Sequence, residues 1–328
     1  MTNKFKNRKV LILGGLGFIG SNLAIKLVEL GAKVTVVDSM LPQYGGNLEN
    51  VAPVKDKLNV NFCDIRDMHT LDYIVQEQEI IFSLAGQTSH IESMHDPHTD
   101  LDINCRSQLA ILESCRRMNH DVEIIYASTR QLYGKPQYLP VDEKHRILPV
   151  DVNGINKYAA EMYYTLYSSL YRMRCVSLRL TNTYGPRQQL RGNKQGFTGI
   201  FIRKAILKED ISIFGDGQQR RDFNYIDDVV DAFLLSSVHI DKCCGNVYNL
   251  GGTETYSLLD FTQTLQSHCP FEYTLVPFPE EHKAIDIGDY YSDFSLFKSI
   301  TGWTPKVELD EGLKKTVEYF EPRIDLFL

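Results

Sequence analysis

The sequence predicts an α/β fold, a doubly wound parallel sheet with a smaller C-terminal lobe. Apolar strand-like segments alternate with helical segments through residues 1–180, which is typical of repeated β-α-β units. Beyond residue 184, glycine, proline and polar residues become more frequent and the alternation stops. We therefore expect the sheet domain over 1–180 and a smaller lobe mainly over 181–328, with the chain returning to the sheet domain around 224–252.

The periodicity of apolar residues places the individual elements. Strands are expected at 10–13, 34–37, 58–62, 80–84, 122–127 and 175–180, and helices at 18–30, 68–76, 100–118 and 153–171. A parallel sheet of this kind binds ligands outside the carboxyl ends of its strands. The candidate site is therefore formed by the segments at those ends, which are 14–20, 38, 64, 85–87, 128–130 and 181–183.

Composition narrows the class of protein. The formal net charge is −7 and the basic residues are scattered, which argues against a nucleic-acid surface. No segment approaches the roughly 20 apolar residues of a membrane span. Seven cysteines without a C-x-x-C pair do not make a disulfide framework. The basic residues near the start precede an apolar run that we interpret as the first strand of the sheet and not as the core of a signal peptide. We expect a cytoplasmic protein that binds neither nucleic acid nor membrane.

A glycine-rich turn is the most informative motif. Gly14, Gly17 and Gly20 lie between the first expected strand and the first helix, and Asp38 ends the second strand. Glycines allow a tight turn and a close approach of the backbone to a pyrophosphate, whose charge then lies at a helix N-terminus. An aspartate at the end of the second strand accepts hydrogen bonds from ribose hydroxyls and repels a 2′-phosphate. This unit predicts a Rossmann-type dinucleotide site that favours NAD over NADP.

Further motifs extend along nearly the whole chain. They include Asp64-Ile65-Arg66-Asp67, Leu84-Ala85-Gly86-Gln87, Asn104, Ser128-Thr129, Leu132-Tyr133-Gly134, 182–188, 214–217, Arg221-Asp222-Phe223, 225–228, 249–251 and Gly302-Trp303-Thr304-Pro305. Together with the glycine turn, they resemble the extended short-chain dehydrogenase/reductase family, in particular its nucleotide-sugar epimerases and dehydratases. The resemblance implies a nucleotide-diphosphate sugar as substrate and a homodimer formed through the helices at 100–118 and 153–171.

The resemblance also implies a reaction in which bound NAD is used transiently. A sugar hydroxyl, usually at C4, loses its proton to a tyrosine as hydride passes to NAD, and the keto-sugar is then rotated, dehydrated, decarboxylated or epimerised. A lysine four residues after the tyrosine holds the nicotinamide ribose, and a Ser or Thr at the preceding strand end bonds the reacting hydroxyl. The implied cofactor-binding residues are Gly14, Gly17, Phe18, Ile19, Gly20, Asp38, Asp64, Ile65, Leu84, Ala85, Gln87 and Lys157.

The sequence departs from the family pattern at the position of the proton-accepting tyrosine. Lys157 and Thr129 match the family, but Asn153 stands where the family has the tyrosine. An amide does not titrate near neutral pH, so Asn153 cannot be the general base, although it can orient substrate or water. Nearby tyrosines that could in principle substitute are Tyr126, Tyr133 and Tyr158. The sequence does not identify the replacement.

A second departure concerns Arg130 and Gln131, which occupy positions where many 4,6-dehydratases carry an Asp-Glu pair. Water elimination needs a proton acceptor and a donor, but arginine stays protonated and glutamine does not titrate. A standard 4,6-dehydratase is therefore disfavoured. Arg130 is expected to bind an additional anionic or polyhydroxyl group, and a loop salt bridge is the alternative.

Substrate contacts are expected from basic and polar side chains. Arg221 is the first candidate for the diphosphate, because a guanidinium binds phosphate oxygens bidentately. The other substrate-binding candidates are Ser89, Arg130, Asn182, Arg187 and Lys283. A cluster formed by His90, His95 and His98 lacks the spacing of a recognised metal site, and no metal is expected.

The expected function is that of an NAD-dependent nucleotide-sugar epimerase acting through a transient keto-sugar at C4 or a neighbouring carbon. The catalytic candidates are Thr129, Arg130, Asn153 and Lys157. The alternatives are a nucleotide-sugar dehydrogenase or reductase, an atypical dehydratase or decarboxylase, and a non-catalytic nucleotide-sugar binder.

Overall fold

The computed structural model describes residues 1–192, 196–280 and 285–328. Its main sheet has seven parallel strands in the order β10-β6-β5-β4-β1-β2-β3. These strands are β1 (Lys9–Leu13), β2 (Lys33–Asp38), β3 (Leu58–Phe62), β4 (Ile80–Ser83), β5 (Glu123–Thr129), β6 (Arg174–Leu180) and β10 (Val247–Asn249). The order reverses direction between β1 and β4, which is the topological switch point of a Rossmann-type sheet. The predicted α/β class and parallel sheet are confirmed.

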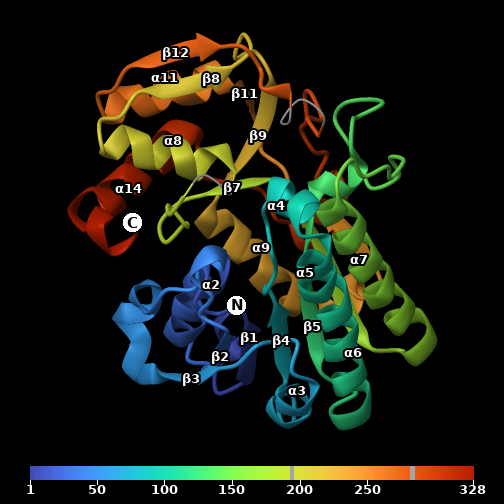
Figure 1. Ribbon diagram of the computed structural model, residues 1–328. Coiled ribbons are helices and arrows are strands. Elements are labelled where there is room, and N and C mark those ends of the chain that lie inside the picture. Colours follow the sequence, from blue (N-terminus) through green and yellow to red (C-terminus); the bar gives the residue numbers. More distant parts are fainter. Residues whose placement is uncertain (193–195, 281–284) are drawn as a thin grey trace.

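Helices cover both faces of the sheet (Figure 1). On one face lie α2 (Phe18–Glu29) and α9 (Ile226–Val238), and on the other lie α3 (Met68–Ile74), α6 (Ser107–Met118) and α7 (Val152–Tyr171). The helix α9 covers one face of the main sheet, and β10 pairs with β6 at the edge of that sheet. The chain therefore returns to the sheet domain after it has built part of the smaller lobe.

The two faces carry separate hydrophobic cores, as the two-residue period of a strand requires. In β1, the side chains of Val10 and Ile12 belong to the core beneath α2 and α9. Those of Leu11 and Leu13 belong to the core beneath α3, α6 and α7. All four are fully buried, which explains why this strand is a continuous apolar run rather than an alternating one.

The smaller lobe lies beyond the carboxyl edge of the main sheet (Figure 1). It has a three-stranded sheet in the order β11-β9-β7 and a two-stranded sheet of β12 and β8. Its elements are β7 (Asn182–Tyr184), α8 (Phe197–Ile206), β8 (Ile211–Phe214), β9 (Arg220–Tyr225), β11 (Thr255–Ser257), α11 (Leu258–His268), β12 (Tyr273–Val276) and α14 (Leu309–Phe320). Its aromatic interior, including Phe201, Phe223 and Phe261, is continuous with the core beneath α2 and α9, so the lobe is packed firmly onto the sheet domain. The helix α13 (Ser295–Thr301) packs against β10 of the main sheet.

Some boundaries differ from the expected ones. The helix expected at 100–118 begins at Pro97 as α5 (Pro97–Leu101), passes through a π-helical turn η3 (Asp102–Arg106) and continues as α6. Asp96 explains the early start, because its side chain accepts a hydrogen bond from Thr99 N (3.1 Å) and caps the helix. The remaining short elements are α1 (Thr2–Phe5), η1 (Pro42–Tyr44), η2 (Leu48–Lys57), α4 (His90–His95), η4 (Arg130–Tyr133), α10 (Ile240–Cys243) and η5 (Glu321–Leu326).

None of the helices in the described part of the chain combines the length and the apolar character that crossing a bilayer requires.

Candidate active site

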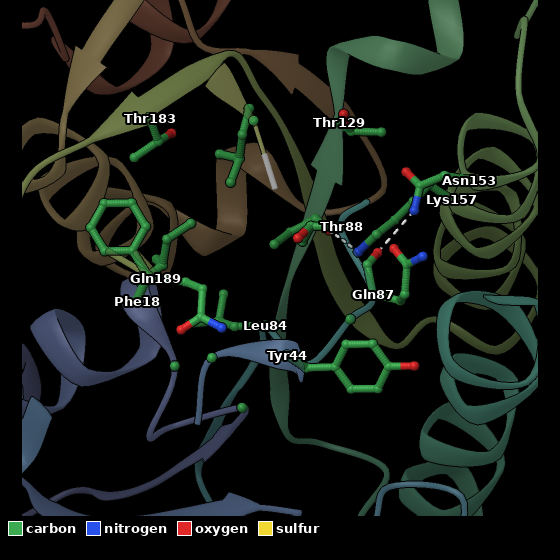
Figure 2. Close-up of a pocket in the computed structure, with 18 of the residues that line it drawn as sticks. Phe18, Tyr44, Leu84, Gln87, Thr88, Thr129, Asn153, Lys157, Thr183 and Gln189 are labelled. Carbon is green, nitrogen blue, oxygen red and sulfur yellow. Dashed lines mark hydrogen bonds between the residues drawn. The ribbon is translucent and has the colours of Figure 1, made fainter. Parts of the chain in front are cut away.

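A cavity of about 540 Å³ lies at the carboxyl edge of the main sheet, between the sheet domain and the smaller lobe (Figure 2). The segments that follow β1, β2, β4, β5 and β6 line one side, and residues such as Phe197 and Ile287 of the smaller lobe line the other. All the predicted site residues in the described ranges line this cavity except Ser89 and Arg187. Lys283 lies outside the described residues.

The glycine turn at the end of β1 is packed against backbone. Gly14 has φ +81°, and a Cβ atom there would lie 2.8 Å from the N and Cα atoms of Ala85. A Cβ atom on Gly20 would lie 2.1 Å from the carbonyl oxygen of Gly14. No side chain caps α2, whose N-cap is Gly17, so its first backbone N–H groups, near Phe18 and Ile19, face the cavity uncapped. This cradle fits the pyrophosphate of a dinucleotide.

Asp38 lies at the end of β2, at the edge of the cavity. Its two carboxylate oxygens accept hydrogen bonds from the backbone N–H groups of Leu16 and Met40, each at 3.0 Å. Burial raises the pKa of this carboxyl, while these backbone N–H groups act in the opposite direction. The contacts fix the carboxylate beside the glycine turn, where a ribose attached to the pyrophosphate would lie.

The segments that follow β3 and β4 complete the side of the cavity that is predicted to bind the cofactor. After β3, Asp64 and Ile65 line the cavity, and Arg66 holds the Asp64 carboxylate through bonds of 2.9 and 2.6 Å. After β4, Leu84, Ala85 and Gln87 line it. Gln87 Oε1 is buried with no partner among the described residues, so this acceptor is available to a cofactor amide or hydroxyl. The donors, acceptors and glycine cradle therefore fit NAD.

Lys157 reaches the cavity from α7. Its Nζ donates to the carbonyl oxygen of Ala127 (3.1 Å) and lies 5.1 Å from the centre of the Tyr126 ring. Burial lowers the pKa of Lys157 from 10.5 to about 8, and the nearby Asp100 carboxylate only partly offsets this. Thr129, at the end of β5, also lines the cavity, and its Oγ1 accepts a hydrogen bond from Gln131 N (3.2 Å). The side chains of Lys157 and Thr129 thus both line the cavity.

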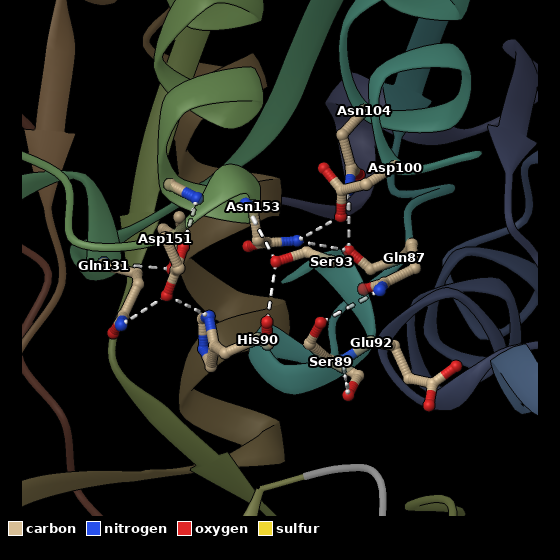
Figure 3. A network of polar contacts seen from close by, with 12 residues as sticks. Gln87, Ser89, His90, Glu92, Ser93, Asp100, Asn104, Gln131, Asp151 and Asn153 are labelled. Atoms are coloured by element: carbon tan, nitrogen blue, oxygen red, sulfur yellow. Dashed lines mark hydrogen bonds and ion pairs between the residues drawn. The ribbon is translucent and has the colours of Figure 1, made fainter. Parts of the chain in front are cut away.

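Asn153 belongs to a buried polar network (Figure 3). Its Nδ2 donates to the carbonyl oxygen of Gln87 (2.8 Å) and to Oδ2 of Asp100 (3.1 Å). The Asp100 carboxylate also accepts from Asn104 (3.0 Å) and Asn156 (2.8 Å), and it is fully buried. The Nδ2 amide group of Asn153 is therefore committed to the loop after β4 and to Asp100 of α5, and only its Oδ1 is left for a ligand.

The three tyrosines considered as substitutes do not line the cavity. Tyr126 lies in the core with its ring stacked on Tyr164 at 4.5 Å, and burial raises its pKa well above the ordinary value. Tyr133 donates to Asn249 (2.8 Å), accepts from Arg179, and has a pKa that burial raises to about 12. The ring of Tyr158 packs against a small core cluster. None of them is placed to take a proton from a ligand in the cavity.

Two arginines lie on the substrate side. Arg130 Nη2 donates to Asn182 Oδ1 (3.1 Å), and its guanidinium lies over the Tyr290 ring at 5.0 Å. Arg130 Nη1 is buried without a partner among the described residues, and the alternative of a loop salt bridge finds no described carboxylate as its partner. Arg221 also lines the cavity, and burial together with the charge of Arg130 lowers its pKa to about 10. Arg221 Nη2 lies 3.7 Å from Oδ1 of Asp286 and donates to Gln219 Oε1 (3.3 Å), so the two guanidiniums are confined on this side of the cavity, of which Arg130 has the unpaired nitrogen.

Arg187 and Ser89 have other roles. Arg187 donates to the carbonyl oxygen of Asn50 and to Oδ1 of Asn22, both at 2.9 Å, and so joins the turn after β7 to α2 and η2. Its place outside the cavity follows from these contacts, which the sequence pattern does not reveal. Ser89 caps α4, since its hydroxyl accepts a hydrogen bond from Glu92 N (3.2 Å).

Among the lining residues that the sequence prediction missed is a histidine. His90, three residues after Gln87, lies beside Asn153 in the cavity wall, and its Nδ1 is 3.0 Å from Oδ2 of Asp151. Among the described residues, no group of three His, Cys, Asp or Glu side chains is arranged to hold a metal ion. The signal that could have identified His90 was its position just after a strand end rather than its spacing from other histidines.

The topology of the sheet, the glycine turn after β1 and the cavity between the two lobes are together typical of an enzyme that uses a dinucleotide. The chain belongs to the NAD dependent epimerase/dehydratase family, which matches residues 10–251. NAD is its cofactor. The protein is accordingly an enzyme of the nucleotide-sugar epimerase and dehydratase class.

Three relatives span nearly the whole chain. A putative UDP-glucose 4-epimerase from Methanocaldococcus jannaschii is 33% identical over 314 residues, covering 95% of this chain and 98% of the relative. The crystal structure of a UDP-glucose 4-epimerase from Thermotoga maritima with UDP-glucose is 32% identical, with a TM-score of 0.88 and coverage of 96% and 99%. A UDP-glucuronic acid 4-epimerase from Bacillus cereus, in complex with UDP-glucuronic acid and NAD, is 25% identical, with a TM-score of 0.84 and coverage of 96% and 99%.

Proposed function

We propose that this enzyme is an epimerase of nucleotide-diphosphate sugars that acts through a transient ketone at C4 of the sugar or at a neighbouring carbon. The observation that carries the proposal is the composition of the cavity wall after β5. It offers Thr129 and Arg130 to a sugar, with Lys157 behind them, and lacks the carboxyl pair that water elimination would need at 130 and 131.

Each side chain has a role that follows from its position. Bound NAD supplies a reversible oxidant for the sugar carbinol. Lys157 would hold the nicotinamide ribose, and the Thr129 hydroxyl would hydrogen-bond the reacting oxygen. Arg221 would bind the diphosphate, and Arg130 an anionic or hydroxyl-rich part of the sugar. Asn182 joins the two segments, because it accepts from Arg130 (3.1 Å) and donates to the carbonyl oxygen of Asp222 (2.9 Å).

The test is proton NMR of the purified enzyme with a panel of nucleotide-diphosphate sugars that differ in nucleobase and sugar. A new anomeric signal from an epimer, at equilibrium and without added cofactor, is the expected result. A matched reaction with the Lys157→Ala variant should leave the substrate spectrum unchanged.

Other outcomes would contradict the proposal in distinguishable ways. Net accumulation of NADH would indicate a dehydrogenase. A new deoxy or decarboxylated sugar would indicate an atypical dehydratase or decarboxylase. Tight binding of a nucleotide sugar to wild type and Lys157→Ala alike, with no conversion, would indicate a binding protein.

We also propose that two copies associate through α6 and α7. One stripe of α7 exposes apolar side chains at spacings of seven, four and four residues, which places them on one face of the helix. They are Ile155 (54% exposed), Met162 (47%), Leu166 (48%) and Leu170 (61%). A second copy with the same stripe would cover them, and a face of this kind is unusual on a monomer.

Charged substitutions test this association. Leu166→Lys combined with Leu170→Lys is expected to halve the mass found by sedimentation equilibrium. Leu275→Lys, at an apolar side chain of similar exposure (52%) in the smaller lobe, is the matched control and should leave the mass unchanged. Equal masses for all three proteins would disprove the α7 interface.

A further inference from the structure

His90 is a titratable side chain in the cavity wall to which neither the sequence pattern nor the proposed mechanism gives a role. It is the first residue of α4, directly after the loop that follows β4. It shares the cavity with Thr129, Asn153 and Lys157. Its imidazole contacts Asp151, the residue that caps the N-terminus of α7, with 3.0 Å between Nδ1 and Oδ2 (Figure 3).

Asp151 is a fixed carboxylate. Its side chain is fully buried, and it accepts hydrogen bonds from Gly154 N (2.7 Å) and from Gln131 Nε2 (2.8 Å) as well as contacting His90. Burial acts to raise the pKa of Asp151, but His90 and the other donors outweigh it and hold the pKa below the ordinary value. Asp151 therefore stays ionised and offers only acceptors to its neighbours.

An ionised neighbour favours one nitrogen of His90 as the site of the proton. Nδ1 lies 3.0 Å from the Asp151 carboxylate but is not aligned for a hydrogen bond with it, and the nearby negative charge favours the proton on Nδ1, which leaves the lone pair on Nε2. Nδ1 is buried, whereas the side chain as a whole is 35% exposed, so the accessible edge of the ring is the one that carries Nε2. Among the described residues no protein atom bonds this nitrogen. An imidazole in this state is a proton acceptor in the wall of the cavity.

Another histidine shows what a purely structural imidazole looks like in this protein. His145 is 3% exposed and uses both of its nitrogens. Its Nε2 accepts a hydrogen bond from Gln137 N (2.8 Å), and its Nδ1 lies 2.7 Å from the carbonyl oxygen of Arg146. His90 instead fixes one nitrogen and leaves the other to the cavity.

The same contacts link His90 to the predicted substrate position. Gln131 donates through its backbone to Thr129 Oγ1 (3.2 Å) and through its side chain to Asp151 (2.8 Å). A continuous chain thus runs from Thr129 through Gln131 and Asp151 to His90. A sugar hydroxyl bonded to Thr129 would lie at the wall that His90 helps to form.

We propose that His90 is the general base and acid of this enzyme, that Asp151 positions it, and that the pair replaces the missing tyrosine. This inference rests on the proposed epimerase function. In the oxidation step, the O–H proton of the sugar carbinol moves to Nε2 of His90, the C–H electron pair and its hydrogen move to the oxidised nicotinamide, and the C–O bond becomes a carbonyl. In the return step the electron pair and hydrogen come back to the carbon, and Nε2 returns its proton to the oxygen.

This assignment explains the local sequence. A tyrosine at 153 would have to enter the space in which Asn153 joins the Gln87 carbonyl to Asp100. Because His90 of α4 supplies the base, the residue at 153 does not need to transfer a proton. Asn153 instead holds the loop that precedes His90 through its bond to the Gln87 carbonyl oxygen. Asn153 N also donates to Ser93 Oγ (3.2 Å), which ties α7 directly to α4.

The test compares His90→Gln with His98→Gln, a histidine exposed on α5 outside the cavity. We expect His90→Gln to lower kcat by about 10²- to 10⁴-fold, with the affinities for NAD and for UDP, measured by calorimetry, unchanged within about twofold. His98→Gln should match wild type. Asp151→Asn keeps a good helix cap, and we expect it to lower kcat while retaining the folded structure and NAD affinity.

A second measurement does not depend on turnover. Nitrogen-15 NMR of the histidine rings in the substrate-free protein should show His90 protonated at Nδ1 in wild type and lose that fixed tautomer in Asp151→Asn. Wild-type rates in His90→Gln, or protonation of His90 at Nε2, would overturn its role while leaving the epimerase proposal intact. A wild-type protein that converts no nucleotide sugar would overturn the proposed function and this role together.

Discussion

Replacing Lys157 by methionine is expected to lower kcat by at least about 10²-fold and, at the same time, to make the cofactor-free protein more stable at neutral pH. Both effects have one cause. Lys157 carries its charge in a fully buried position whose described protein partner is the Ala127 carbonyl oxygen. Methionine fills similar volume without that charge.

The pH dependence of the stability effect follows from the lowered pKa. The pKa of Lys157 falls from 10.5 to about 8 on folding, so the folded protein binds fewer protons than the unfolded chain between these values. The buried charge of Lys157 therefore destabilises the folded protein by about 3 kcal/mol below pH 8. This destabilisation disappears as the pH rises toward 10.5. Allowing about 1 kcal/mol for the lost hydrogen bond, Lys157→Met should be more stable than wild type by about 2 kcal/mol at pH 7.

Urea unfolding of the cofactor-free proteins at pH 7 and pH 10 measures this difference. The advantage of Lys157→Met should shrink or vanish at pH 10, whereas Lys314→Met, at an exposed position of α14, should differ little from wild type at either pH. An advantage that grows with pH would show that the buried amine is not the source of the effect.

Replacing Arg179 by methionine is expected to destabilise the protein by about 3 to 5 kcal/mol. Arg179 and Glu161 are both almost fully buried and form two hydrogen bonds, of 2.9 and 2.5 Å. Ser128 donates a further bond to the same glutamate (2.7 Å), just before the cavity residue Thr129. Removing the arginine leaves an uncompensated carboxylate between β5, β6 and α7.

The double variant Arg179→Met, Glu161→Leu should recover much of the lost stability, because both buried charges are then absent. Arg106→Met is the matched control, since Arg106 forms an exposed ion pair with Asp102 and should contribute under about 1 kcal/mol. Thermal unfolding of the four proteins measures these differences. A double variant no more stable than Arg179→Met would contradict the explanation by unpaired charge.

The fold could be predicted because its signals are local. The buried strands 10–13 and 80–84 are apolar runs, and helix 153–171 has a clear apolar period. The glycine turn and Asp38 lie within one β-α-β unit, so their spacing along the chain already implies their arrangement in space. The start of α5 at Pro97 and the π-helical turn η3 were missed, because each depends on one capping contact or on packing rather than on periodicity.

The site residues could be predicted where they follow strand ends or match a motif of the family, as Lys157 and Arg221 do. Thr129, Asn182 and Gln87 line the cavity for that reason. Arg187 was predicted as a basic side chain for the substrate, but its guanidinium instead donates hydrogen bonds to Asn22 and Asn50, which lie over a hundred positions earlier in the chain. No local pattern could have indicated this, since the choice of partner is made when α2 and the smaller lobe pack together.

The sequence by itself determined the sheet, the dinucleotide site and the absence of a tyrosine at 153, because these depend on residue type and short-range spacing. Only the tertiary structure decided which side chains meet in the cavity. It brings Asp151 to His90 across 61 positions of the chain, commits the Asn153 amide to Asp100, and confines Arg130 near Arg221. Such contacts join elements that are distant in sequence, and their geometry is fixed by the packing of α4, α7 and the smaller lobe around the carboxyl edge of the sheet.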